Sequence, residues 1–533
     1  MAQTVQEDQR VPAVPGPPRA WHTLWRAATA VAGGVVLFFA FPPAGLWFLA
    51  PPGVALLTLA VRGVRPRRAA WLGYLGGAAF LVPALTWVQP IGDDAWLALV
   101  AIESLFFAAM SAGVALVTRL RGWPVWTAAL WVAQEWARGL FPVGGFPWVR
   151  VAFSQGESPF TPYAALGGAP LVTFAVVLCG GLLASAAARI APRQGGGAAV
   201  RWTAYVLAGA LVVPLLAYAV PRPGAEASGT VRVGVIQGNV PGTGMGFLGD
   251  QPAVVLRNHA DKTHELAQAV RAGKVARPDI VIWPENSTDI DPYRSTFAYD
   301  VIDAAVRDIG VPVLVGAVVR SPDGQHRMTR GIVWDPAHGP GAYYDKRKLV
   351  PFGEFVPFKE LLEKFIKRID LVGLQSLPGD RDGDLKMGPV TVGAVECYEV
   401  AFDDTVRSTV LTGGSPLVVQ TNNATYALSN LPPQQLAMSQ LRAVEHNRAV
   451  ITAATTGISA YVDPDGKVRW RTAERVADMA VVDVQIRKGE TLATRVGALP
   501  ERALLLIGAG ALAVALSRRR RPPQLDKSEE EDG

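Results

Sequence analysis

The chain has 533 residues, a hydrophobic fraction of 50% and a mean hydropathy of +0.23, which is high for a wholly soluble protein. Its net charge is +6, but the basic residues lie between apolar segments and form no patch interleaved with aromatic residues, which argues against a nucleic-acid partner. Two cysteines, Cys179 and Cys397, exclude a disulfide framework, and six scattered histidines show no metal-ligand spacing. We therefore expect a membrane protein with one soluble domain, free thiols and no metal or other cofactor.

Residues 1–22 combine several prolines with polar neighbours and predict a disordered cytoplasmic tail. Eight apolar segments then follow along the chain as candidate transmembrane helices. They cover residues 25–41, 46–61, 69–88, 95–117, 123–136, 164–187, 202–219 and 499–517. The first seven form a predicted membrane domain at 23–220, and the eighth precedes a charged cytoplasmic tail at 518–533.

Arginine is distributed unevenly over the connections between these segments. Residues 62–68 and 518–521 contain four arginines each, and 189–201 contains three, whereas the loops 42–46 and 89–94 contain neither Lys nor Arg. By the positive-inside rule, the arginine-rich connections and both termini are predicted to be cytoplasmic. Seven preceding spans then place the soluble domain on the extracytoplasmic side.

The soluble domain at 229–490 alternates predicted strands with predicted helices. Strands are expected at 231–237, 279–283, 311–319, 331–335, 341–345, in the run ending at Cys397, and at 416–420, 449–455, 458–463 and 477–485. Helices are expected at 255–272, 294–308 and 433–448. This alternation predicts a layered α/β domain.

Three segments are candidates for contact with lipid. The loop 144–148 combines glycines with Phe146 and Trp148, aromatic residues that favour the membrane interface and are predicted to border the substrate's access route. Residues 358–369 carry an apolar face opposite a basic one, which is typical of an interfacial helix or of a surface helix packed on its own domain. Residues 238–249 are predicted to be either a loop that reaches the lipid or an ordinary glycine-rich loop.

Glu135 and Arg138 stand three residues apart at the end of the fifth apolar segment. Ionisable residues at such a depth usually pair, and they often mark a functional site. The spacing therefore predicts either an ion pair between the two at the helix end or a functional role.

Three residues that suit acyl transfer follow predicted strands. The sequence around Cys397 predicts either a nucleophile or a buried thiol of the hydrophobic core. Because a free thiol has a pKa of about 8.5, a nucleophilic cysteine needs a base, and Glu285 is a candidate. Lys346 is a candidate to stabilise the oxyanion that forms when sulfur attacks a carbonyl. We expect these side chains, each at the end of a separate strand of one sheet, to converge in one acyl-transfer centre.

The motifs around these residues resemble the three motifs of the nitrilase superfamily. They are Trp283-Pro-Glu285, Lys346 leading to Leu349-Val-Pro-Phe-Gly-Glu354, and Cys397-Tyr-Glu399. Together with the eight apolar segments, the chain resembles the family of bacterial apolipoprotein N-acyltransferases over residues 23–517, including 145–148 and 438–448. The resemblance implies an α-β-β-α sandwich inserted between the seventh and eighth membrane helices.

The resemblance also implies a mechanism. Glu285 would be the general base, Lys346 the stabiliser of the tetrahedral intermediate and Cys397 the nucleophile, in a ping-pong reaction through a thioester. The acyl donor would be a membrane phospholipid, and the acceptor would be the N-terminal amine of a diacylglyceryl-modified apolipoprotein. Supporting roles are implied for Glu354, Tyr398 and Glu399. Residues 422–426 depart from the family's Asn-Asp-Ala-Trp-Phe-like stretch, which affects the acceptor pocket.

The implied protein spans the bacterial cytoplasmic (inner) membrane several times. Its oligomeric state is open, and nothing in the sequence requires more than a monomer. Two other functions fit part of the pattern. A membrane-tethered nitrilase-like amidase would use the same three residues with water as acceptor, but it needs no polytopic anchor. A non-catalytic scaffold or transporter would be expected to lack a member of the triad, and all three residues are present.

Overall fold

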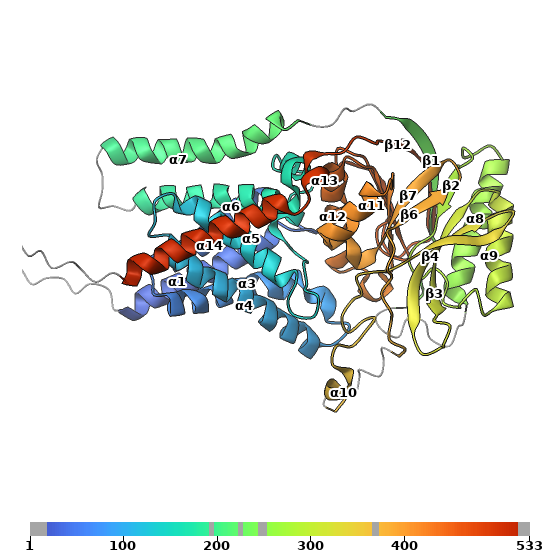
Figure 1. The fold of residues 1–533 in the computed structure, drawn as a ribbon, viewed down its shortest axis with the longest axis horizontal. Coiled ribbons are helices and arrows are strands. Elements are labelled where there is room, and N and C mark those ends of the chain that lie inside the picture. Colours follow the sequence, from blue (N-terminus) through green and yellow to red (C-terminus); the bar gives the residue numbers. More distant parts are fainter. Residues whose placement is uncertain (1–18, 191–196, 222–226, 243–252, 365–372, 521–533) are drawn as a thin grey trace, which may run out of the picture.

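The computed structural model describes residues 19–190, 197–221, 227–242, 253–364 and 373–520. A helical bundle and a two-sheet domain lie next to each other along the long axis of the molecule (Figure 1). Most of the predicted tails, residues 243–249 of the glycine-rich loop and residues 365–369 of the predicted interfacial helix lie outside the described residues. The described part of that helix is α10, Lys359–Leu362.

The helical bundle contains a helix at each of the eight predicted spans. These helices are α1 (Arg19–Phe39), α2 (Ala50–Val61), α3 (Pro66–Ala84), α4 (Asp93–Val117), α5 (Trp123–Arg138), α6 (Ala164–Ile190), α7 (Gly197–Leu216) and α14 (Leu499–Arg520). Among the described residues, four segments are long and apolar enough to cross a membrane: His22–Phe39, Asp93–Val117, Thr161–Arg189 and Leu499–Arg519. These apolar helices belong to a membrane protein.

Proline determines where the second helix begins. The predicted segment 46–61 forms a 3-10 turn at Trp47–Leu49 and then α2, whose first turn contains Pro51 and Pro52. Proline is suited to the first turn because the backbone N–H that it lacks would have no partner within the helix. The straight helix is therefore shorter than the apolar run.

The soluble domain consists of two six-stranded sheets. The first has the order β12 (Asp478–Ile486), β1 (Gly229–Gln237), β2 (Ile280–Ile282), β3 (Val313–Arg320), β4 (Arg327–Asp335) and β5 (Gly339–Asp345). The second has the order β11 (Val468–Arg471), β10 (Ala460–Val462), β9 (Val450–Ala454), β8 (Leu417–Thr421), β7 (Val390–Glu396) and β6 (Asp384–Met387). The central strands β1 to β3 and β7 to β9 pair in parallel, and the outer strands pair antiparallel.

Helices cover the outer face of each sheet. Helices α8 (Val254–Arg271) and α9 (Thr296–Ile309) pack on the first sheet, and α11 (Asp403–Leu411) and α12 (Leu431–His446) pack on the second. The strands alternate accordingly: Val392 and Ala394 of β7 face the other sheet, and Val395 faces the helices. The predicted α-β-β-α sandwich is therefore confirmed.

The α11–α12 layer lies between the second sheet and the bundle (Figure 1). One continuous apolar core runs from bundle residues such as Trp131 and Trp148 to Tyr398 and to Leu441 of α12. An interior packed in this way makes the bundle and the sandwich one mechanical unit rather than two domains on a linker.

Among the described elements, strands β6 and β11 and helices α11 and α13 (Leu492–Val496) were not expected from the sequence. Strands β6 and β11 alternate polar and apolar residues, but each has only four residues, the shortest run over which that pattern indicates a strand. Helix α11 begins with Asp403 and Asp404 and contains few apolar residues, so its periodicity is weak.

Candidate active site

Glu285, Lys346 and Cys397 meet at one edge of the sandwich. Glu285 lies three residues beyond β2, Lys346 follows β5 directly, and Cys397 follows β7 directly. Lys346 Nζ donates to Glu285 Oε1 at 2.9 Å and to Glu354 at 3.1 Å. The expectation that all three come from one sheet is wrong, because β2 and β5 belong to the first sheet and β7 to the second. The centre therefore lies between the two sheets, at the carboxyl ends of β2, β5 and β7.

The backbone at Cys397 is unusual. Its φ of +47° lies in the left-handed region, which a non-glycine residue rarely adopts. Cys397 also begins the 3-10 turn Cys397–Ala401, so the chain turns sharply at the end of β7. This turn presents a half-buried thiol at the edge of the sheet.

Two polar side chains contact the sulfur that were not anticipated from the sequence. Thr421 Oγ1, at the end of β8, lies 3.1 Å from Cys397 Sγ, and Gln435 Nε2, in the second turn of α12, lies 3.6 Å from it. Gln435 Oε1 in turn accepts from Thr421 Oγ1 at 2.9 Å. Gln435 is 2% exposed, and the signal available in the sequence was a polar residue within the predicted helix 433–448.

Lys346 is a buried ammonium between two carboxylates. Burial lowers its pKa, but the charges of Glu285 and Glu354 outweigh this and raise the pKa well above its ordinary value. Glu354 is itself held by Thr329 Oγ1 at 3.0 Å and by Val350 N at 2.7 Å. Lys346 therefore offers a fixed positive charge beside the thiol at neutral pH.

The pKa values of both the acid and the thiol are raised, with burial as the largest cause for each. Burial raises the pKa of Glu285, against the opposing effect of Lys346. Burial and then the charge of Glu285 raise the pKa of the Cys397 thiol to about 12, although Lys346 and the hydrogen bonds from Thr421 and Gln435 act to lower it. The resting sulfur is therefore protonated at neutral pH and needs a base. A carboxylate with a raised pKa is suited to that role.

Glu399 connects the elements that carry the lysine and the cysteine. Its carboxylate accepts from Arg347 N at 2.7 Å, from Lys348 N at 2.9 Å, from Glu396 N at 2.8 Å and from Tyr344 Oη at 2.8 Å. These bonds fix the turn after β5 against the end of β7. Glu399 thus holds the backbone of both active-site segments.

Aromatic side chains of the bundle pack against the residue that follows Cys397, and we call the group Phe146, Trp148 and Tyr398 the aromatic wall. The ring of Tyr398, adjacent to the nucleophile, lies 6.3 Å from the ring of Phe146 and 6.1 Å from that of Trp148. Trp148 Nε1 donates to Gln434 Oε1 at 2.8 Å, and Tyr398 Oη donates to Gly145 O at 3.1 Å. Gly145 has φ +81°, and a Cβ there would lie 2.1 Å from the carbonyl carbon of Gly139, so the loop needs glycine at this position.

The expectation of an ion pair between Glu135 and Arg138 is wrong. Arg138 Nη1 lies 3.1 Å from Glu103 Oε2 on α4, and Arg138 Nη2 donates to Trp148 O at 2.6 Å. Glu135 accepts instead from Val151 N at 2.7 Å and from Thr173 Oγ1 at 2.8 Å. Arg138 therefore fixes the backbone of Trp148, one of the residues of the aromatic wall.

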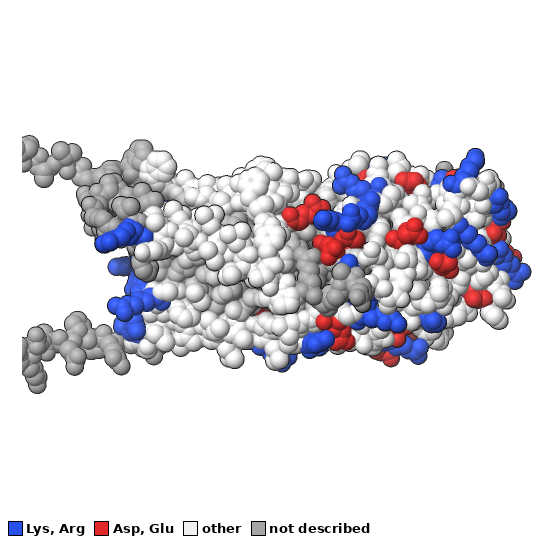
Figure 2. Space-filling model, turned by 90° about the horizontal axis from the view of Figure 1, so that it is seen from above, with Lys and Arg blue, Asp and Glu red and all other residues white. Residues whose placement is uncertain are grey.

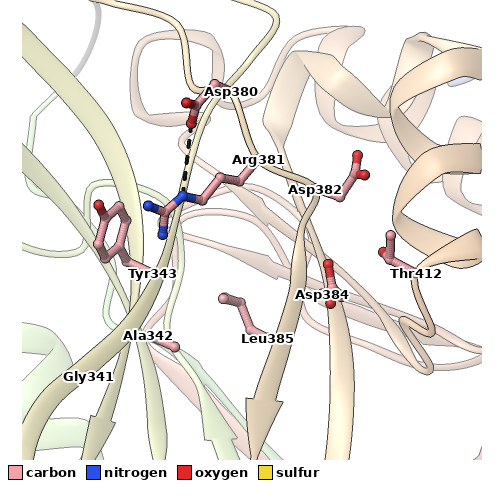
Figure 3. Close-up of a pocket in the computed structure, with 9 residues that line it drawn as sticks. All are labelled: Gly341, Ala342, Tyr343, Asp380, Arg381, Asp382, Asp384, Leu385 and Thr412. Atoms are coloured by element: carbon pink, nitrogen blue, oxygen red, sulfur yellow. Dashed lines mark ion pairs between the residues drawn. The ribbon is translucent and has the colours of Figure 1, made fainter.

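A surface pocket of about 550 Å³ lies beside β5 and β6 (Figure 3). Tyr343, Asp380, Arg381 and Asp382 are among its lining residues, and Arg381 Nε lies 4.0 Å from Asp380 Oδ1. It contains none of the predicted site residues. Within the described part of the chain, no three or more His, Cys, Asp or Glu side chains are grouped as metal ligands.

Comparison with known proteins identifies two matching family models. The apolipoprotein N-acyltransferase N-terminal domain matches residues 33–182, and the carbon-nitrogen hydrolase family matches residues 235–493. A solved amidase from Nesterenkonia sp. AN1, of the nitrilase superfamily, is 17% identical with a TM-score of 0.38 over 53% of this chain and 99% of its own, a likeness too distant to bear on the chemistry.

Two relatives match nearly the whole chain. The apolipoprotein N-acyltransferase of Mycolicibacterium smegmatis is 41% identical over 508 residues, which cover 92% of this chain and 85% of the relative. That of Azotobacter vinelandii is 30% identical over 513 residues, which cover 92% of this chain and 95% of the relative. The chain belongs to the apolipoprotein N-acyltransferase family.

Proposed function

We propose that this protein transfers an acyl chain from a membrane phospholipid, through a thioester on Cys397, to the N-terminal amine of a diacylglyceryl-modified apolipoprotein. Membership of the family supports N-acylation in lipoprotein maturation. The observation that carries the proposal is the packing of Tyr398, next to the thiol, on Phe146 and Trp148 of the bundle. A thiol walled by membrane-helix loops can reach a carbonyl whose acyl chain stays in lipid.

In the first half-reaction Glu285 accepts the proton of Cys397 Sγ, and the sulfur attacks the ester carbonyl carbon of the phospholipid. The negative charge that develops on the carbonyl oxygen is stabilised by the Lys346 ammonium. The ester C–O bond then breaks, and protonated Glu285 returns its proton to the leaving lysophospholipid oxygen. A thioester remains on Cys397.

In the second half-reaction the apolipoprotein's amine attacks the thioester carbonyl and Glu285 accepts a proton from the nitrogen. The C–S bond breaks, and the sulfur leaves as a thiolate that recovers a proton from Glu285. Water competes with the amine for the same carbonyl. The aromatic wall of Phe146, Trp148 and Tyr398 limits that competition by covering the nucleophile's flank.

We also propose that all eight bundle helices span the inner membrane, with both termini cytoplasmic and residues 229–490 outside the cytoplasm. Figure 2 shows basic side chains at the end of the bundle away from the sandwich, followed by a band that lacks charge. Exposed arginines such as Arg62, Arg65 and Arg119 lie in the short loops between bundle helices. This pattern supports the positive-inside orientation. The enzyme is proposed to act as a monomer.

The membrane domain has a physical purpose in this reaction. Each buried CH₂ of an acyl chain contributes about 0.8 kcal/mol to membrane retention, so donor and acceptor lipids remain in the bilayer. The catalytic centre must therefore be held at the membrane surface. A soluble amide substrate would not need this arrangement.

The test is to incubate the purified full-length protein with a phospholipid labelled in its acyl chain. The expected result is a protein-bound label that hydroxylamine releases and that Cys397→Ala does not acquire. A diacylated lipopeptide with a free amine should discharge it, and the same lipopeptide with an acetylated amine should not. If water discharges the label as fast as the free amine does, the protein is a hydrolase and the proposal fails.

A further inference from the structure

Glu396 is a buried acid that the acyl-transfer mechanism does not use. It is the last residue of β7, directly before the nucleophile. Because strand side chains alternate, it points with Val392 and Ala394 into the space between the sheets. It is 0% exposed; its side chain approaches the backbone N–H of Glu399 in a capping-box arrangement, and its carboxyl oxygens have no other hydrogen-bond partner among the described residues. An ionised carboxylate in such surroundings would be strongly unfavourable.

Gln420 lies beside Glu396 and has a buried acceptor oxygen that lacks a hydrogen-bond donor within the described part of the chain. The two residues are paired in the parallel register of β7 and β8. Gln420 Nε2 donates at 2.7 Å to the carbonyl of Trp283, which directly follows β2 of the opposite sheet, but its buried Oε1 has no donor among the residues that the structure describes. Trp283 is two residues before Glu285, so this amide connects the second sheet to the segment that carries the base.

Gly331 of β4 brings the two unpaired groups together. A Cβ at Gly331 would lie 2.7 Å from Gln420 Oε1 and 3.2 Å from Glu396 Oε1. Both oxygens therefore occupy the space over one glycine, and any larger residue would displace them. A protonated Glu396 has the hydroxyl donor that Gln420 Oε1 lacks, whereas an ionised one has only acceptors.

We propose that Glu396 is protonated in the resting enzyme and donates a hydrogen bond to Gln420 Oε1. The resulting chain runs from Glu396 through Gln420 to the carbonyl of Trp283. It crosses both sheets behind the active site and fixes the distance between Cys397 and Glu285. Glu396 is thus a positioning residue, which acts through the backbone on both sides of it.

The charges around Glu396 favour its protonated form. Glu285, Glu399 and Glu354 are negative groups near it, and Lys346 is the opposing positive group. Burial, followed by these carboxylates, raises the pKa of Glu396 well above its ordinary value in spite of Lys346. As the pH rises through that pKa, the donor is lost and a charge appears behind the nucleophile, so thioester formation should decline on the alkaline side.

The test compares Glu396→Gln, which keeps a donor without a titratable proton, with Glu396→Leu, which removes it. In the infrared spectrum of the full-length protein, a C=O band of a buried protonated carboxyl should be present and should vanish in E396Q. In phospholipid-dependent thioester formation, E396Q should stay active and lose the alkaline decline. E396L should lower kcat about 10²-fold, since small displacements of reacting groups cost this much, with KM unchanged.

The exposed strand residue Asp483 supplies the control: Asp483→Asn should keep the band and the alkaline decline. The proposal is overturned if the native spectrum lacks the band, or if E396Q loses activity as E396L does, because an ionised Glu396 would then be required. Of the two measurements, only the kinetics of thioester formation rest on the proposed function. If the native protein forms no thioester, the proposed function fails, and the infrared band still decides the state of Glu396.

Discussion

At the scale of single residues, Glu285 acts on Cys397 in two conflicting ways. In the proposed mechanism it is the base that takes the thiol's proton, yet its charge helps to raise the pKa of that thiol to about 12. The positive charge of Lys346, whose Nζ lies 2.9 Å from Glu285 Oε1, stabilises both the Glu285 carboxylate and the Cys397 thiolate. Without a bound substrate, the sulfur is thus protonated at neutral pH.

Replacing Glu285 by Gln should separate these effects. Turnover should fall by about 10²-fold to 10⁴-fold because the base is lost. The pKa of Cys397 should nevertheless move below about 12, since a nearby negative charge is removed. The pKa is measured from the pH dependence of alkylation by iodoacetamide.

Asp300→Asn, a change at an exposed carboxylate on α9, is the matched control and should leave both turnover and alkylation unchanged. An E285Q protein whose thiol pKa rises, or whose turnover persists, would contradict this assignment of roles.

At the scale of elements, an ion network connects the bundle to the helix layer of the sandwich. Asp403, at the start of α11, lies 2.9 Å from Arg150 of the bundle and 2.7 Å from Arg442 of α12. Burial acts to raise the pKa of Asp403, but the two arginines hold it well below its ordinary range. The carboxylate's contribution to stability is therefore complete above pH ~4, its ordinary pKa, and is lost only as the pH falls below that value.

Asp403→Asn should lower the free energy of unfolding at pH 7 by about 2–3 kcal/mol, because two buried guanidinium groups lose their shared counter-charge. The expected loss is at the lower end for such pairs since the Asp403 side chain is 33% exposed. Tryptophan fluorescence during urea unfolding in detergent measures the loss.

The neighbour Asp404, whose side chain is 68% exposed and pairs with Lys348, provides the control. Asp404→Asn should cost less than about 1 kcal/mol. Equal losses for the two variants would show that the network does not couple the bundle to the sandwich.

The sequence predicted the positions of helices and strands better than it predicted which strands share a sheet and which side chains are in contact. The patterns located most strands and the positions of Glu285, Lys346 and Cys397, since motif and periodicity are local properties. They did not indicate that β7 belongs to a second sheet, because a strand end looks the same in either sheet. Spacing suggested a pair between Glu135 and Arg138, but Arg138 binds Glu103, 35 residues away in the chain. Contacts such as Thr421 to Cys397 also depend on tertiary packing.

At the scale of the whole molecule, the distribution of charge predicts how the protein lies in the membrane (Figure 2). In a Cys179→Ala, Cys397→Ala background, one cysteine is introduced at exposed Gln89 and another, in a separate variant, at exposed Arg119. A membrane-impermeant maleimide applied to intact cells should label Gln89→Cys. Arg119→Cys should be labelled only after permeabilisation. The reverse pattern would invert the proposed orientation.

The unbroken core between bundle and sandwich also determines whether the reaction rate depends on the bulk concentration of the lipid or on its concentration within the membrane. A catalytic centre that cannot swing away from the bilayer meets its substrates only by lateral diffusion. Its rate should then follow the mole fraction of donor lipid in the surrounding bilayer or micelle, not the number of lipid molecules per volume of solution. Adding inert detergent at constant enzyme and lipid would slow the reaction by surface dilution, as the same acyl chains spread over a larger area.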